Sequence, residues 1–307
     1  MKILLFNFNN VLTDVAEELV ARGHELLDLK DVGDMKVWKK ADVIVVWNET
    51  ELAGWRHYIT EMKKMGKRIV LVQHGRRGTS RIYPPFNETL ISDAVCVWGE
   101  NDKKRLMSVG VPEEKIFITG TPIWKHLKPR VPHEGKNVVF SPEHWDVDVS
   151  ENLIVADQLR KLKKVNIITK GLKNHQIETL YDNFIGTDRN SPEHFPIVAD
   201  VLSKADVVVA LSESTFEMLA QSLDIPVVIA DIWIPKACDG DDRYKDYHRE
   251  YSNAVVMSSL EKLNDAVIHS LKHPELLRNE RKDIIIKDGG FDIKDPISNI
   301  INVITGK

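Results

Sequence analysis

ADVVVALSESTFEMLAQSLDIPVVIAD, residues 205–231, is the stretch that decides the fold of this chain. The apolar run Val207–Ala210 predicts a buried strand, and the helical spacing of apolar residues from Thr215 onward predicts a helix. Ser-Glu-Ser-Thr, residues 212–215, forms the turn between them, and residues 225–231 follow as another strand. This order predicts one βαβ unit, the building block of a parallel sheet covered by helices.

The turn combines hydroxyl side chains with the start of a helix. Backbone N–H groups and the positive end of the helix dipole meet at such a point, and Ser212, Ser214 and Thr215 add hydroxyl donors. The turn is therefore suited to hold a phosphate group. The same residues also suit ordinary capping of a helix, so both interpretations stay open.

Composition sets wide bounds around this unit. The 307 residues predict two domains, and 42 basic against 46 acidic residues give a net charge of −4 that demands no nucleic-acid partner. The two cysteines, Cys96 and Cys238, make no metal-binding spacing. The first ten residues predict a strand and not a signal peptide, and no apolar stretch has membrane-spanning length, so we expect a cytoplasmic protein.

Short apolar runs alternate with helical patterns along the whole chain, which predicts an α/β protein with two doubly wound parallel sheets. Between the two series of strands, residues 122–136 are rich in Pro, Gly and basic residues and predict a linker. Helices are expected at residues 11–26 and 51–67, among others. The predicted strands are residues 2–8, 41–49, 68–74, 93–100 and 115–122 in the first series, and 137–143, 165–171, 205–213, 225–231 and 253–259 in the second.

Polar residues crowd the carboxyl ends of these strands, where open α/β sheets bind ligands. No dinucleotide-binding glycine fingerprint and no P-loop motif occurs, which argues against an NAD-dependent dehydrogenase and a P-loop NTPase. No Asp-x-Asp pair follows a strand, and Asp239–Asp242 fits a solvated loop, so we expect no bound metal.

Several motifs resemble GT-B glycosyltransferases related to the CDP-glycerol glycerophosphotransferases and capsular polysaccharide transferases. In those families a strand ends in Gln-His-Gly, as at residues 73–75, and a later strand ends in Trp-Gly-Glu, as at residues 98–100. The passage GVPEEKIFITGTP at residues 110–122, the strand VNIITKG with its lysine, the turn at residues 212–215 and the C-terminal KHPELLRNERKDIIIKDGGFD are also similar. The likeness covers roughly residues 70–295.

The resemblance implies two Rossmann-like domains whose parallel sheets face an interdomain cleft. Residues 1–125 would form the acceptor domain and residues 126–307 the nucleotide-donor domain, with the last helix returning to the N-terminal domain. The co-substrate would be a UDP-, GDP- or CDP-linked sugar, with no tightly bound cofactor. The acceptor, a glycan, a small molecule or a modified DNA base, and the oligomeric state stay open.

For the donor, the resemblance implies a phosphate site at Ser212, Glu213, Ser214 and Thr215. Glu217 would bind the ribose hydroxyls, although an acidic residue also suits the first turn of any helix. Lys170 would neutralise a phosphate, whereas a lysine after a strand is also often merely exposed. Further candidates are Ser141 and His175; the family's lysine is commonly followed closely by His-Pro, whereas His175 lies five residues beyond Lys170.

For catalysis, we expect His74 to take a proton from the acceptor hydroxyl, because histidine titrates near neutral pH and His74 follows a buried strand. A phosphate contact or simple packing at the strand end are its alternatives. Glu49 is the alternative base, or a helix cap. Arg76, Arg77, Asn9 and Asn10 are candidates to contact the acceptor or a phosphate, although arginines on a loop are often only solvated.

Three hypotheses about function follow. The first is a nucleotide-sugar-dependent glycosyltransferase or a close relative that moves a polyol phosphate from a CDP-linked donor. The second is a sugar-nucleotide epimerase of the UDP-N-acetylglucosamine 2-epimerase type, which shares the architecture and a histidine after the same strand. The third is a non-catalytic protein that binds a sugar nucleotide.

Overall fold

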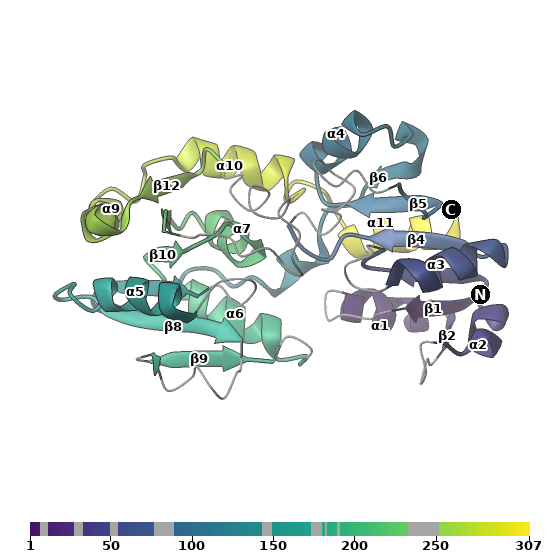
Figure 1. The fold of residues 1–307 in the computed structure, drawn as a ribbon, viewed down its shortest axis with the longest axis horizontal. Coiled ribbons are helices and arrows are strands. Elements are labelled where there is room, and N and C mark those ends of the chain that lie inside the picture. The colour runs from purple at the N-terminus through teal and green to yellow at the C-terminus, as the bar shows by residue number, and fades with distance from the viewer. Residues whose placement is uncertain are drawn as a thin grey trace. The chain divides into compact units, whose positions relative to one another are not determined.

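The computed structural model describes residues 1–6, 12–27, 33–49, 55–76, 89–142, 149–172, 180–181, 183–188, 191–232 and 252–307. The chain divides into two compact units. Unit 1 comprises Met1–Ile123 and Ile286–Lys307, and unit 2 comprises Trp124–Ile285. Each unit is a parallel sheet with helices on both faces, as Figure 1 shows.

Unit 1 contains a six-stranded parallel sheet in the order β2-β1-β3-β4-β5-β6. The chain runs from β1 to β2 on one side and then crosses to β3 on the other side of β1, so the order of strands reverses between β1 and β3. Its strands are β1 (Lys2–Phe6), β2 (Glu25–Leu27), β3 (Val43–Val46), β4 (Arg68–Val72), β5 (Ala94–Val97) and β6 (Ile116–Ile118). Its helices are α1 (Thr13–Ala21), α2 (Met35–Lys40), α3 (Trp55–Lys64), α4 (Glu100–Ser108), the short η3 (Glu113–Lys115) and α11 (Pro296–Thr305).

Alternate residues of these strands face two separate cores. Ile44 and Val46 of β3 pack with Ile59 and Met62 of α3. Val43 and Val45 point the other way, into the core that α1 and α11 cover. The C-terminal helix α11 packs against β3, β4 and β5, and Figure 1 shows it in yellow beside the last two.

Unit 2 contains a second six-stranded parallel sheet in the order β12-β11-β10-β7-β8-β9. The strand order reverses between β7 and β10, so read from β9 the sheet has the 3-2-1-4-5-6 order of dinucleotide-binding folds. Its elements are β7 (Asn137–Ser141), α5 (Val149–Leu159), β8 (Asn166–Leu172), β9 (Phe184–Thr187), α6 (His194–Ser203), β10 (Val207–Ala210), α7 (Thr215–Ser222), β11 (Val227–Ala230), β12 (Val255–Ser258), η7 (Leu260–Lys262) and α9 (Leu263–Lys272). Two helices contain the residues at which the chain passes from one unit to the other. They are η4 (Pro122–His126) and α10 (Arg278–Lys287).

The prediction of two doubly wound parallel sheets is confirmed, and all ten predicted strands are present. Two further strands escaped the sequence patterns. The helix predicted over residues 11–26 ends at Ala21, and the segment after it forms the edge strand β2. The other, β9, is also an edge strand. None of the described helices combines the length and the apolar character that a membrane crossing needs.

Candidate functional site

In unit 1, Gln73 braces the Gln-His-Gly turn at the carboxyl end of β4. Its side chain is fully buried; Nε2 donates to the backbone oxygen of Gly75 (3.0 Å) and to Oδ2 of Asp102 (2.8 Å), and Oε1 accepts from the backbone N–H of Trp98 (2.9 Å). Trp98 in turn donates its indole N–H to the backbone oxygen of Gln73 (3.0 Å). These bonds tie the residue before His74 to the end of β5 and to α4.

His74 lies against the neighbouring strand end. Its Nδ1 is 3.0 Å from the backbone oxygen of Trp47, and its ring packs edge-on against the Trp47 indole with centroids 4.1 Å apart. A carbonyl oxygen only accepts, so Nδ1 carries the proton and the lone pair of the neutral ring is on Nε2. This tautomer is the one that a base acting through Nε2 requires.

Glu49 follows β3 and is buried, with 1% of its surface exposed. Its carboxylate accepts from the backbone N–H groups of Ile91 (2.8 Å) and Ser92 (3.1 Å) and from the Ser92 hydroxyl. Burial raises the pKa of Glu49, against these hydrogen bonds, which lower it. The contacts show Glu49 anchoring the segment that leads into β5.

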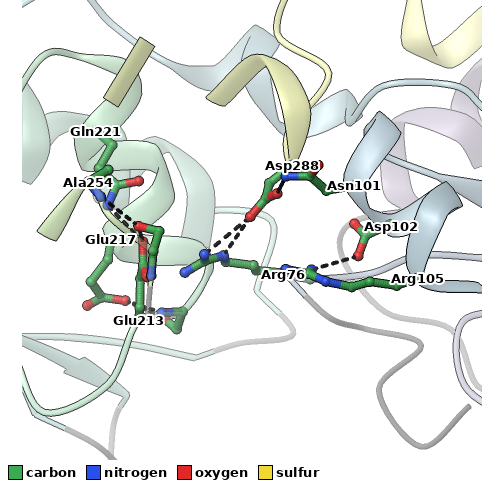
Figure 2. A network of polar contacts seen from close by, with 12 residues as sticks. Arg76, Asn101, Asp102, Arg105, Glu213, Glu217, Gln221, Ala254 and Asp288 are labelled. Atoms are coloured by element: carbon green, nitrogen blue, oxygen red, sulfur yellow. Dashed lines mark hydrogen bonds and ion pairs between the residues drawn. The ribbon is translucent and has the colours of Figure 1, made fainter. Parts of the chain in front are cut away.

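Arg76 forms a buried ion pair inside unit 1. Its guanidinium contacts Oδ2 of Asp288 at 3.2 and 3.4 Å, and both side chains are at least 97% buried. Asn101 of α4 donates to the other carboxylate oxygen at 2.7 Å, as Figure 2 shows. Asp288 lies in a close-packed segment, because a Cβ on Gly99 would come within 2.1 Å of the backbone oxygen of Lys287. Arg76 therefore links the loop after β4 to the segment that precedes α11.

In unit 2, the turn at residues 212–215 ends in a capping box. The Ser214 hydroxyl accepts from the backbone N–H of Phe216 (3.2 Å), while the Glu217 carboxylate accepts from the backbone N–H (2.8 Å) and hydroxyl of Ser214. Glu217 is 1% exposed. The structure thus shows Ser214 and Glu217 capping the helix, and Thr215 is the first residue of α7.

Glu213, in the same turn, is 8% exposed. Its carboxylate accepts from the Gln221 amide (2.8 Å) and from both the backbone N–H and the hydroxyl of Ser252 (2.7 Å each), as Figure 2 shows in part. These bonds fix the turn to Ser252, which lies three residues before the start of β12.

Lys170, near the carboxyl end of β8, is only 5% exposed. Its ammonium donates to the backbone oxygen of Gly171 (3.0 Å) and to the Thr187 hydroxyl (2.9 Å). Burial lowers the pKa of Lys170 to about 8. Among the residues that the structure describes, no carboxylate forms an ion pair with it, so a positive charge is buried without a negative partner.

The strand register brings Ser141, Lys170 and the turn at 212–215 to one end of the sheet. Ser141 ends β7 and pairs with Ala210 of β10, directly before the turn. Thr169 of β8 pairs with Phe140, so Lys170 lies one step further along and on the same face as Ser141. The strand order reverses between β7 and β10, which is where sheets of this type bind ligands.

Four of the predicted site residues lie outside the described residues. They are Asn9, Asn10, Arg77 and His175, and Asp239–Asp242 does so as well. Within the described part of the chain, no group of three or more His, Cys, Asp or Glu side chains is placed to hold a metal ion. The structure also shows contacts that sequence reasoning missed: Asp288 at Arg76, and Thr187 and His194 near Lys170. No sequence signal pointed to them, because their partners are 212, 17 and 7 residues away.

Comparison with solved structures identifies the fold. UDP-GlcNAc 2-epimerase from Neisseria meningitidis bound to UDP-GlcNAc has a TM-score of 0.66 at 12% identity, and the match covers 100% of both chains. The chain has the GT-B fold. S. aureus MnaA in complex with UDP scores 0.62 at 11% identity, covering 100% of this chain and 95% of that one. The wall teichoic acid polymerase TagF soaked with CDPG scores 0.59 at 13% identity, covering 99% and 89%.

The GT-B fold predicted from the sequence motifs is confirmed by these likenesses. No protein-family model and no curated protein matches the chain. At 11–13% identity the likenesses show the GT-B fold alone.

Proposed function

We propose that the chain is a nucleotide-sugar-dependent glycosyltransferase whose donor binds unit 2. One observation carries the proposal: Ser141, the turn at 212–215 and the Lys170 ammonium, which pairs with no carboxylate of the described residues, lie at the end of the sheet where the strand order of unit 2 reverses. An anion there would gain an ammonium group, hydroxyl donors and the N-terminus of α7. The nucleotides UDP-GlcNAc, UDP and CDPG in the neighbouring structures support a nucleotide as the ligand.

In this proposal Lys170 stabilises the charge that develops on the leaving nucleoside diphosphate as the glycosidic bond to the donor breaks. Fixed cations and dipoles aimed at developing charge are a major source of catalysis. Ser212 and Thr215 would hold the phosphates by hydrogen bonds. Glu217 and Ser214 keep the helix N-terminus in place through the capping box, so we assign them to positioning the turn.

His74 is the proposed base for the acceptor hydroxyl. The Trp47 carbonyl fixes the proton on Nδ1, which leaves Nε2 as the atom that takes the acceptor proton while the oxygen attacks the sugar carbon. Glu49, buried and bonded to Ile91 and Ser92, is assigned to holding the structure around this site. Arg76 is assigned likewise, because Asp288 already compensates its charge.

Two other activities of the same fold have specific support. The TagF likeness favours transfer of a polyol phosphate from a CDP-linked donor, and the Neisseria enzyme favours epimerisation at C2 of a UDP-linked sugar. In all three proposed activities the donor would bind unit 2. The activities differ in the reaction that the bound donor undergoes. The glycosyltransferase is the first choice because of the motif order in residues 70–295.

A donor panel separates these activities. The protein is incubated with UDP-GlcNAc, GDP-mannose, UDP-glucose and CDP-glycerol without acceptor, and products are followed by NMR and chromatography. Slow release of free sugar and nucleoside diphosphate supports the glycosyltransferase, while release of CMP supports the phosphotransferase. A new sugar epimer that is still bound to the nucleotide supports the epimerase. Thr215→Val and Lys170→Met variants serve as controls that should lose the reaction.

A further inference from the structure

The Lys170 ammonium is one end of a hydrogen-bond chain that continues across β9 to α6. Lys170 donates to the Thr187 hydroxyl at 2.9 Å, and that hydroxyl is 3.0 Å from Nδ1 of His194. Lys170 pairs with Ile185 in the register of β8 and β9, so Thr187, two residues further on, lies diagonally from it on the same face of the sheet. His194 is the first residue of α6.

The available donors and acceptors fix the direction of the hydrogen bonds from Lys170 through Thr187 to His194. Thr187 is 2% exposed, and its hydroxyl has one proton to give. Because the ammonium donates to this hydroxyl, the Thr187 proton is directed to Nδ1 of His194, which accepts it in the tautomer with the ring proton on Nε2. The reverse direction, His194 to Thr187, would leave the buried Thr187 proton without a partner among the described residues, which costs free energy.

Within the described residues, the ammonium is held by two neutral oxygen atoms, those of Gly171 and Thr187. A side chain kept only for stability would normally have a carboxylate beside it, since a buried charge is costly unless it is paired. The cost of burying this charge also lowers the pKa of Lys170, to about 8. Thr187 and His194 therefore fix the place of a cation that the described part of unit 2 leaves uncompensated.

We propose that Thr187 and His194 are positioning residues that hold Lys170 as the cation of an anion site at the carboxyl ends of β8 and β9, and that this site takes a phosphate group of the nucleotide. The inference rests on the proposed donor site of unit 2. It extends that site to two residues that no sequence motif marks. His194 reaches Lys170 through Thr187, whereas His175, the histidine that the resemblance implies near Lys170, lies outside the described residues.

Two matched pairs of variants test it, with inorganic pyrophosphate, UDP and CDP as probes in isothermal titration calorimetry. Thr187→Val keeps the shape and removes the hydroxyl, whereas Thr187→Ser keeps the hydroxyl. His194→Phe removes the Nδ1 acceptor, whereas His194→Asn retains an acceptor at that position. We expect Thr187→Val and His194→Phe each to weaken pyrophosphate binding by about tenfold, and the conservative partners to stay within about threefold of wild type.

A direct readout comes from NMR of the Lys170 side chain in the wild-type protein. Pyrophosphate that contacts the ammonium should raise the pKa of Lys170, because an anion stabilises the charged form. The same titration in Thr187→Ser should show the same rise. If Lys170 only stabilised the fold and did not contact the anion, its pKa would stay unchanged when pyrophosphate binds.

The outcomes separate this inference from the proposed function. If wild type binds UDP or CDP and all four variants bind them equally well, the positioning roles are wrong and the donor site stands. If wild type binds pyrophosphate with the expected variant pattern but no nucleotide, the anion site stands and the nucleotide function falls. If wild type binds none of the three probes, both are wrong.

Discussion

At the scale of single residues, Lys170 carries the strongest sign of function. A lysine with a pKa of about 8 binds fewer protons in the folded chain than its ordinary value of 10.5 allows in the unfolded chain. Stability therefore rises with pH between about 8 and 10.5, and below pH 8 the folded state bears the full cost of the buried charge. A shift of this size corresponds to about 3 kcal/mol.

Lys170→Met should remove that cost. We expect the free energy of unfolding at pH 7 to increase by about 1 to 3 kcal/mol and its rise between pH 8 and 10.5 to flatten. Urea denaturation at several pH values measures both effects. Lys161→Met, at an exposed lysine of the same unit, is the control and should change stability by less than about 0.5 kcal/mol. If the Lys170→Met protein were less stable than wild type at pH 7, the ammonium would instead stabilise the folded state.

His74 offers a test of the chemistry in unit 1. If its Nε2 takes the acceptor proton, His74→Ala should lower turnover by a factor on the order of 10² to 10⁴, while donor affinity changes little. Steady-state kinetics and donor titration measure the two quantities separately. Normal turnover in the variant would exclude the base role, and a collapse of donor affinity would favour a phosphate contact instead.

At the scale of elements, the docking of α11 on unit 1 has an identifiable cause. The Arg68 guanidinium, at the start of β4, donates to the backbone oxygens of Val303 (2.7 Å) and Ile304 (2.5 Å). These carbonyls belong to the last turn of α11, where the helix itself supplies few donors, although the Val303 oxygen also accepts from the backbone N–H of Gly306 at 3.4 Å. The cation also suits the negative end of the helix dipole. At the first turn of the same helix, the exposed Arg22 contacts the Ser298 hydroxyl at 2.6 Å.

The two arginines form a matched pair. Arg68→Met should lower the free energy of unfolding by about 1 to 3 kcal/mol, because it removes two hydrogen bonds to partly buried carbonyls. Arg22→Met should cost less than about 0.5 kcal/mol, since its contact lies in solvent. Chemical denaturation of both variants provides the comparison. Equal effects would contradict the role given to the Arg68 contacts.

The sequence predicted elements best where apolar runs were continuous. The run Val207–Ala210 is buried along its whole length, as are Val43–Val46, Ala94–Val97 and Val227–Ala230, and the apolar composition of these runs alone marks them as strands. The edge strand β2 was missed because Glu25–Leu27 continues the helical pattern of the residues before it, and β9 was missed because Phe184–Thr187 has only two apolar residues before its glycine. Thr187 of the Lys170–Thr187–His194 chain lies in β9, so missing this strand also meant missing Thr187 as a residue of the candidate site.

Local contacts at the site were predictable only in part. Ser-x-x-Glu at residues 214–217 is the sequence signature of a capping box, and the structure contains it. The buried pair of Arg76 and Asp288 joins residues 212 positions apart, which no local pattern can indicate. Sequence reasoning therefore identified which strand ends carry polar residues, and the structure adds what each side chain contacts.

At the scale of the whole molecule, we predict that the two units close on the donor about a hinge near residues 122–136. Closure would exclude water and bring the acceptor hydroxyl, activated by His74, to the sugar held by unit 2. Small-angle scattering with and without UDP or CDP should show a smaller radius of gyration with nucleotide, and the hinge should become less sensitive to protease. An unchanged profile together with unchanged proteolysis would count against closure.

The central claim is that a nucleoside diphosphate binds unit 2 where its strand order reverses. The most direct measurement is a crystal structure of the chain soaked with UDP or CDP. The account predicts the diphosphate within hydrogen-bond distance of Lys170 Nζ and of Thr215, above the carboxyl ends of β7, β8 and β10. A diphosphate held by unit 1, or a nucleotide whose phosphates contact neither Lys170 nor the turn at residues 212–215, would contradict it.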